Sequence, residues 1–258
     1  MPATDLPLLI DAARAAGKVA TRFSGKTARR WDKPDDAGPV TEADLAVNDL
    51  LAKTLLGERP AYGWLSEETD DGEERLSKDR VFIIDPIDGT RSFVEGARTW
   101  AHSIAVTERG RVTAAVVFLP MHDRLYAAAL GQGATLNGQS LSASETATPG
   151  EMEVLAAKPA FKAQHWRGGA VPDVKRGYRP SLAYRLALVA EGRFDAMLTL
   201  RPTWEWDIAA GSLIVTEAGG AATTRDGAAL VFNNPDPRVD GILAGGMPSH
   251  AHLRATLA

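Results

Sequence analysis

Residues 81–93 read VFIIDPIDGTRSF, and they carry the strongest clues to both architecture and chemistry. The first four are apolar β-formers, which predict a buried strand that ends in a turn at Asp85 and Pro86. The turn brings Asp85 and Asp88 together, and like charges in proximity are costly unless a cation lies between them. Gly89 precedes an expected helix start, where exposed backbone N–H groups bind phosphate. Hard carboxylate oxygens beside anion-binding amides indicate magnesium and phosphate together.

An Asp-Pro-x-Asp-Gly segment is also an ordinary surface turn, so two further acidic clusters bear on the choice. Ser66-Glu67-Glu68 puts paired carboxylates after a short strand, although a solvated acidic face also explains this run. Trp206-Asp207 puts an aspartate at the head of an apolar helix, where its default role is to cap the helix. Taken one at a time, the three clusters leave structural and functional interpretations open.

The composition of the 258-residue chain excludes several classes of protein. Without cysteine there is no disulfide framework, thiolate zinc site, iron–sulfur cluster or cysteine nucleophile. Lysine plus arginine total 29 and aspartate plus glutamate 33, which gives a formal charge of −4. The chain therefore lacks the positive electrostatic field of a typical nucleic-acid binder. No apolar run reaches the roughly 20 residues of a membrane span. Because residues 1–11 lack a basic region followed by an apolar stretch, we expect no signal peptide and a cytoplasmic protein.

Hydrophobic periodicity predicts helices and strands along the whole chain. Helices are expected over 6–19, 41–55, 181–191 and 207–218. Strands are expected over 63–66, 81–84, 101–108, 111–119, 124–129, 154–157 and 196–200, with a polar loop over 32–38 and a charged exposed stretch over 67–79. The composition changes near Gly138, and residues 140–150 are rich in serine and threonine. Mixed elements in both parts predict a layered α+β or α/β architecture with a boundary in this region.

Four segments match, in order, the motifs of the inositol monophosphatase superfamily of magnesium-dependent, lithium-sensitive phosphatases. They are Val40-Thr-Glu-Ala-Asp44, Ser66-Glu-Glu68, Asp85-Pro-Ile-Asp-Gly-Thr90, and Trp206-Asp207 with Glu217-Ala-Gly-Gly220. The chain therefore resembles this superfamily over residues 40–220. The resemblance implies a layered α/β/α/β/α sandwich of the inositol monophosphatase and fructose-1,6-bisphosphatase type. An N-terminal half, 1–137, would supply most metal ligands, and a C-terminal half, 138–258, would face it across a cleft.

The resemblance also implies a set of metal ligands. Glu67, Asp85 and the backbone carbonyl of Ile87 would hold a first magnesium ion. Asp85 would bridge to a second ion held by Asp88 and Asp207, and these last two also lie beside the phosphate. A third, weaker ion would lie near Glu67. Two or three Mg²⁺ ions and inhibition by Li⁺ are therefore expected.

Roles in binding and catalysis follow from the same resemblance. The amides of Gly89 and Thr90 would bind the phosphate. Asp44 and the Thr90 hydroxyl would orient and deprotonate the attacking water, and Glu68 would support the site from behind. The site would then hydrolyse a phosphate monoester without a covalent enzyme intermediate.

The phosphate ester itself is harder to choose. Inositol monophosphatases usually carry a glutamate seven residues before the tryptophan-linked aspartate, where this chain has Leu200. Residues 204–207, WEWD, residues 66–71 and Arg75 look like bacterial CysQ-type 3′(2′),5′-bisphosphate nucleotidases. Arg185 stands where those enzymes usually have a lysine, and a cation there would serve a second phosphate. We therefore expect conversion of 3′-phosphoadenosine 5′-phosphate (PAP) to AMP, a step of sulfur assimilation.

Several alternatives remain open. Arg185 is equally well an exposed helical residue paired with an acid, and Arg91 is a second candidate for substrate charge. Trp204 and Trp206 offer aromatic faces for an adenine, or Trp206 at least is structural packing that positions Asp207. An inositol-1-monophosphatase or broad sugar-phosphate phosphatase is the first alternative function, and a non-catalytic metal-binding scaffold is the second. We expect a small phosphorylated substrate, no nucleic-acid polymer, no integral membrane segment, and either a monomer or a homodimer.

Overall fold

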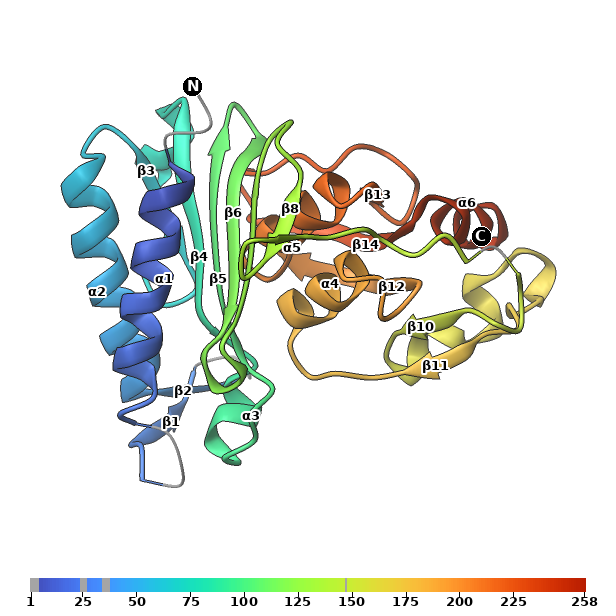
Figure 1. The fold of residues 1–258 in the computed structure, drawn as a ribbon, viewed down its shortest axis with the longest axis horizontal. Helices are drawn as coiled ribbons and strands as arrows, with labels where there is room; N and C mark the ends of the chain where they lie inside the picture. The colour runs from blue at the N-terminus through green and yellow to red at the C-terminus, as the bar shows by residue number, and fades with distance from the viewer. Residues whose placement is uncertain (1–4, 24–26, 34–37, 147) are drawn as a thin grey trace.

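The computed structural model describes residues 5–23, 27–33, 38–146 and 148–258. Two helices, α1 (Leu6–Ala20) and α2 (Glu42–Glu58), cover one face of a seven-stranded sheet (Figure 1). In spatial order its strands are β3 (Gly63–Ser66), β4 (Arg80–Asp88), β5 (Ala101–Glu108), β6 (Arg111–Leu119), β7 (Arg124–Ala129), β8 (Ala134–Leu136) and β9 (Gln139–Ser140).

The second sheet has five strands in the order β11-β10-β12-β14-β13. Helices α4 (Leu182–Ala190) and α5 (Glu205–Glu217) lie between the two sheets, and α6 (Met247–Thr256) packs on β13 and β14 at the far side (Figure 1). The strands are β10 (Glu153–Leu155), β11 (Lys175–Gly177), β12 (Ala196–Trp204), β13 (Gly220–Thr223) and β14 (Arg238–Gly246). The layers alternate helix, sheet, helix, sheet, helix, which confirms the predicted sandwich.

Strand β4 shows why the sequence reads as a continuous apolar run. Phe82 and Ile84 pack in the core beneath α1 and α2, while Val81 and Ile83 pack in the core that contains α4 and α5. Successive side chains of a strand point to opposite faces, so a strand covered by helices on both sides needs apolar residues at every position. This strand therefore carries its last residues, Asp85 and Asp88, into the buried interior.

Two shorter elements frame the end of β4. A two-stranded sheet joins β1 (Arg30–Asp32) to β2 (Pro39–Thr41), and α3 (Thr90–Val94) follows β4 directly. The predicted loop over 32–38 falls partly outside the described residues, as does residue 147 in the predicted boundary region. The sheets span 63–140 and 153–246, and the division at residue 138 stays a prediction.

Three sequence-based expectations were wrong in detail. Strand β4 does not end at Asp85: pairing with β5 shifts register between Asp85 and Asp88 and then resumes. Residues 67–79 are not wholly exposed, because a 3₁₀ turn over Glu73–Ser77 buries Arg75. Asp207 does not cap α5, because the cap position is Trp204 and Asp207 is the third helical residue. The first two differences depend on partners elsewhere in the chain: strand β5 for β4, and Asn233 for Arg75.

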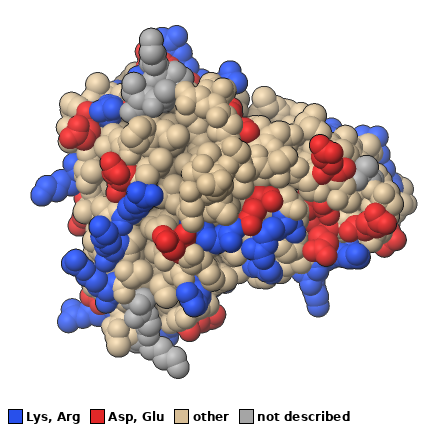
Figure 2. Space-filling model, viewed as in Figure 1, with Lys and Arg blue, Asp and Glu red and all other residues tan. Residues whose placement is uncertain are grey.

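The surface matches the small net charge. Figure 2 shows basic and acidic side chains interspersed over the face of the molecule drawn there. Among the described residues, none of the helices has both the length and the apolar character needed to cross a membrane.

Candidate active site

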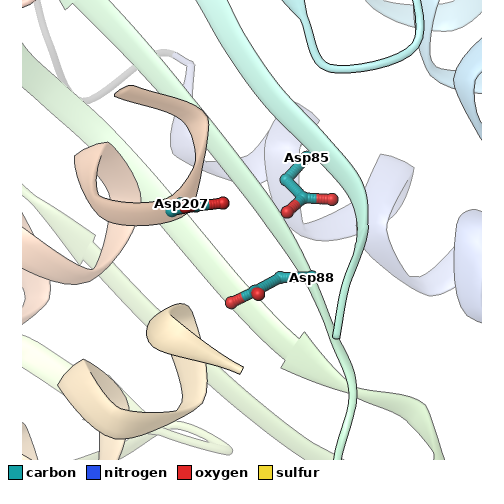
Figure 3. A group of neighbouring side chains, drawn as sticks. All are labelled: Asp85, Asp88 and Asp207. Carbon is teal, nitrogen blue, oxygen red and sulfur yellow. The ribbon is translucent and has the colours of Figure 1, made fainter. Parts of the chain in front are cut away.

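Three aspartates meet where β4 ends and α5 begins. Carboxylate oxygens of Asp85, Asp88 and Asp207 all lie within 4.8 Å of one another, and Figure 3 shows the three side chains converging. In a regular strand, residues three apart point to opposite faces. The register shift between Asp85 and Asp88 breaks this rule and lets one strand present both side chains on one side.

Asp85 carries the clearest mark of a cation site. Its Oδ1 atom is buried and has no hydrogen-bond partner among the described residues. Burial raises the pKa of Asp85 well above its usual value, and the charges of Glu67, Asp88 and Asp207 raise it further. A buried unpaired carboxylate oxygen is costly, whereas a divalent cation with oxygen ligands would satisfy it. The residues present therefore fit Mg²⁺.

Asp88 is held by the start of α4. Its Oδ2 accepts hydrogen bonds from the Ser181 hydroxyl at 2.7 Å and from the Ala183 amide at 2.6 Å. Burial raises the pKa of Asp88 to about 6, because it outweighs these two bonds, which lower the pKa. With Oδ2 so engaged, Oδ1 is free to face Asp85 and Asp207. Sequence reasoning missed the role of Ser181, although a serine before an apolar helix is a capping signal.

Asp44 lies in the first turn of α2, where a capping box holds it. Its Oδ2 accepts from the Thr41 amide at 2.8 Å and from the Thr41 hydroxyl at 2.5 Å. Its Oδ1 lies 3.3 Å from the Thr90 hydroxyl, which also lies 3.1 Å from the Ile87 carbonyl. Burial raises the pKa of Asp44 to about 6. The capping box thus engages Oδ2 and leaves Oδ1 of Asp44, a carboxyl group with a raised pKa, beside the Thr90 hydroxyl.

The paired glutamates after β3 contact a lysine that the sequence analysis overlooked. Lys33 Nζ donates to Glu67 Oε1 at 2.9 Å and to Glu68 Oε1 at 2.7 Å. Burial raises the pKa of Glu68 to about 7, with the Glu67 charge adding to the rise and Lys33 opposing it. Lys33 gave no signal because it stands in a polar loop with no periodic pattern.

A cavity of about 500 Å³ opens over the aspartates. Besides Asp85, Asp88 and Asp207, its walls include Glu67, Gly89, Thr90, Arg91, Tyr178, Pro180, Arg201, Trp204 and Trp206. The rings of Trp204 and Trp206 stack at 4.7 Å between centroids. Trp206 is buried, whereas Trp204 is 38% exposed and has the Arg238 guanidinium over its ring, 5.3 Å from the centroid.

A second cavity of about 410 Å³ shares Tyr178, Pro180 and Arg201 with the first. Leu200 and Arg185 line this second cavity. Arg185 is buried, its Nε donates to the Arg179 carbonyl, and its guanidinium lies 4.5 Å from the centroid of the Tyr178 ring. The alternative of an exposed helical arginine is therefore wrong, and the side chain instead lines the cavity next to the one over the aspartates.

The sequence matches the Inositol monophosphatase family over residues 3–257. It is 34% identical over 235 residues to the inositol-1-monophosphatase of Rhizobium meliloti (strain 1021), covering 86% of each chain. It is 34% identical over 253 residues to the histidinol-phosphatase of Mycobacterium tuberculosis (strain ATCC 25618 / H37Rv), covering 93% of this chain and 94% of that one.

Two further comparisons agree. The Nus factor SuhB of Escherichia coli (strain K12) is 35% identical over 227 residues, which are 83% of each chain. The structure of the Thermotoga maritima IMPase superposes with a TM-score of 0.82 at 28% identity, covering 97% of this chain and 95% of that one. Together with the family match, these similarities show that the chain belongs to the inositol monophosphatase family, a family of magnesium-dependent phosphatases.

Proposed function

We propose that this chain hydrolyses the 3′-phosphate of 3′-phosphoadenosine 5′-phosphate with the help of Mg²⁺ and releases AMP. The observation that carries metal-dependent hydrolysis is the convergence of three aspartates around the unpartnered Oδ1 of Asp85. Family membership supports a phosphoric monoester hydrolase, and the choice of PAP rests on the cavity walls.

Five residues would hold the metal ions: Glu67, Asp85, Asp88, Asp207 and the carbonyl of Ile87. Bound magnesium would neutralise phosphate charge, lower the pKa of water and align the attacking and leaving oxygens. Two or three ions are expected, with Li⁺ as an inhibitor. Lys33 would hold Glu67 from behind with the support of Glu68, because its ammonium group bonds to both carboxylates.

Asp44 would act as the general base. A base is most effective when its pKa lies near the working pH, and burial raises that of Asp44 to about 6. The Thr41 capping box engages Oδ2, so Oδ1 remains to take a proton from water that the Thr90 hydroxyl orients. The amides of Gly89 and Thr90 would bind phosphate oxygens. Gly89 has φ +97°, a left-handed backbone conformation that other residues adopt only with strain.

The leaving group would occupy the two adjoining cavities. Tyr178, which is 51% exposed, can stack on an adenine, and Arg201 lies on the shared wall. Arg185, beyond Tyr178, supplies a buried cation for the 5′-phosphate. Leu200 lines the same cavity and has no group to hydrogen-bond a polyol, which argues against inositol.

Two other functions are alternatives to hydrolysis of PAP. The Rhizobium relative bears the name inositol-1-monophosphatase, which supports an inositol-phosphate or broader sugar-phosphate activity. A non-catalytic scaffold is the alternative of another class, and the SuhB relative bears the name Nus factor. The presence of Asp44, Glu67, Asp85, Asp88 and Asp207 supports catalysis over a scaffold, because a degenerate site would be expected to lack a ligand.

Phosphate release with Mg²⁺ from PAP, inositol 1-phosphate, histidinol phosphate and fructose 1,6-bisphosphate tests this proposal. We expect kcat/KM for PAP to exceed the others by at least about tenfold, as one added charge-assisted hydrogen bond implies. Arg185→Met should reduce this advantage and leave activity on histidinol phosphate unchanged. Preference for inositol 1-phosphate over PAP would overturn the substrate assignment. No release from any ester, with Mg²⁺ bound normally, would favour the scaffold.

A further inference from the structure

A buried arginine links the two halves of the chain. Arg75 is only 3% exposed, and its guanidinium forms a fork with Asp71 through bonds of 2.6 and 2.7 Å. The guanidinium also bonds to Asn233 and Asn234, which lie 158 and 159 positions later in the sequence. Nη1 donates to Asn233 Oδ1 at 2.7 Å, and Nη2 donates to the Asn234 carbonyl at 2.9 Å. The function proposed above makes no use of this cluster.

The same two asparagines hold the first residue of α5. Glu205 is fully buried, and its carboxylate accepts from the Asn233 amide at 2.6 Å and from the Asn234 amide at 2.9 Å. The Asn234 side-chain amide adds a third bond at 2.7 Å. Asn233 adopts φ +61°, a left-handed conformation in which asparagine is enriched among non-glycine residues. The turn is thus shaped so that both of its amides face Glu205.

A second tie holds the next residue of the helix. The Ser103 hydroxyl on β5 donates to the Trp206 carbonyl at 2.8 Å, and Ser103 pairs with Asp85 in the sheet register. The first turn of α5 is therefore tied to the first sheet through Ser103, and through the asparagine turn and Arg75 to the 3₁₀ turn that precedes β4. These anchors matter because Asp207 faces two other carboxylates, and like charges repel in a buried site.

We propose that Arg75, Asn233, Asn234 and Glu205 form a clamp that positions Asp207 against Asp85 and Asp88, so that the metal ligands on α5 and β4 stay in register. The clamp rests on the metal site proposed above, and its members are positioning residues that touch neither metal nor substrate. Charge-assisted hydrogen bonds such as those of Arg75 and Glu205 are the stronger kind, which suits them to resist this repulsion. Loss of the clamp weakens metal binding more than it weakens the fold.

A second ion pair between the halves provides a matched control. Arg124 on β7 lies 2.5 Å from Glu191, which follows the last residue of α4. The Tyr126 hydroxyl donates to the same carboxylate at 2.8 Å. This cluster also joins the first sheet to the helices between the sheets, but it contacts the far end of α4 and not the head of α5. Arg124→Met removes an ion pair between the first sheet and the helices and leaves the contacts at the head of α5 in place.

The experiment titrates Mg²⁺ alone into metal-free wild type, Arg75→Met, Glu205→Gln and Arg124→Met by calorimetry, with kcat and KM measured alongside. Glu205→Gln keeps the side-chain shape and turns an amide group toward the N–H donors of the asparagines, so it carries little risk of unfolding. We expect Arg75→Met and Glu205→Gln to raise the Kd of Mg²⁺ by about tenfold, the usual effect of losing a supporting contact. Saturating Mg²⁺ should restore kcat with KM unchanged, and Arg124→Met should keep the wild-type Kd.

Where wild type binds Mg²⁺, two results would overturn the clamp: an unchanged Kd in both clamp variants, or an equal rise in all three variants, which would mean general loosening. Urea unfolding in the presence of a chelator separates stability from metal affinity. Wild type that binds no Mg²⁺ would overturn the metal site and the clamp with it. Wild type that binds Mg²⁺ as tightly as the clamp variants would overturn the clamp alone and leave the proposed phosphatase intact.

Discussion

Asp44 shows how a local structural device prepares a reactive group. The capping box at the start of α2 is an ordinary way to satisfy free helix amides, and here it uses only Oδ2 of Asp44. The remaining oxygen lies beside the Thr90 hydroxyl in a buried setting that raises the pKa of Asp44 to about 6. One residue therefore stabilises a helix and presents a base to the cavity.

Asp44→Asn tests the role of this base. The amide keeps the shape and one capping oxygen but cannot take a proton, so turnover should fall by about 10²- to 10⁴-fold. Steady-state kinetics and Mg²⁺ calorimetry measure the loss of rate and the expected retention of metal binding. Asp49→Asn, on the exposed side of the same helix, serves as the control and should keep full activity. Near-normal rates of the Asp44 variant with added Mg²⁺ would show that another group is the base.

At the level of elements, the close packing of α4 on α5 sets the distance between two groups of ligands. The head of α4 holds Asp88 through Ser181, and α5 carries Asp207. Gly211 allows this approach, since a Cβ atom there would lie 2.5 Å from the Cβ of Leu186. Larger residues at this contact would push the helices apart.

Gly211→Ala should therefore destabilise the fold by about 1–3 kcal/mol, the usual cost of overpacking a core contact. Urea unfolding without metal measures this change. Gly57→Ala in α2 is the control, because its Cβ would meet nothing within 4 Å. In a helix that substitution should stabilise by roughly 0.5–1 kcal/mol. A Gly211 variant as stable as the control would show that α4 and α5 move apart without cost.

At the scale of the molecule, the proposed metal site brings together a strand and a helix that are far apart in the sequence. Asp85 and Asp88 belong to the first sheet, whereas Asp207 lies in the first turn of α5, a helix that packs on both sheets. The chain carries a formal charge of −4, and two bound Mg²⁺ ions would cancel it. A small phosphate ester therefore meets a cavity whose local charge the bound ions reverse.

Magnesium should raise the unfolding temperature, because it binds the folded chain and not the unfolded one. Differential scanning fluorimetry measures the shift, and Asp85→Asn should abolish it. A full shift in that variant would move the metal site away from Asp85. Arg109→Met, in an exposed pair with Asp79, is the matched surface control and should keep the shift.

The rise in unfolding temperature that magnesium causes should also increase with pH. Burial raises the pKa of Asp44 and Asp88 from 3.8 to about 6, so the metal-free fold favours their protonated forms. Their contribution to stability is complete below about pH 4 and is lost as the pH rises through 6. Magnesium requires the ionised forms, so its stabilising effect should be small at pH 5 and larger at pH 7. A shift independent of pH would contradict this linkage.

The sequence alone determined the elements and the chemical class of the site. Apolar runs and turn signals place strands and helices, because these patterns depend on near neighbours along the chain. The four motifs with their carboxylates indicate the family, and the comparisons confirm it. The roles of individual site residues stay predictions that the experiments above address.

Only the tertiary structure decided which contacts surround those residues. The bulge after Asp85 depends on pairing with β5, and the burial of Arg75 depends on a turn 158 residues later. Ser181 and Lys33 gain their roles from carboxylates that no local pattern connects to them. The physical reason is that a charged side chain is expected to be exposed to solvent unless another segment packs against it. Which segment does so depends on the fold as a whole and not on the neighbouring sequence.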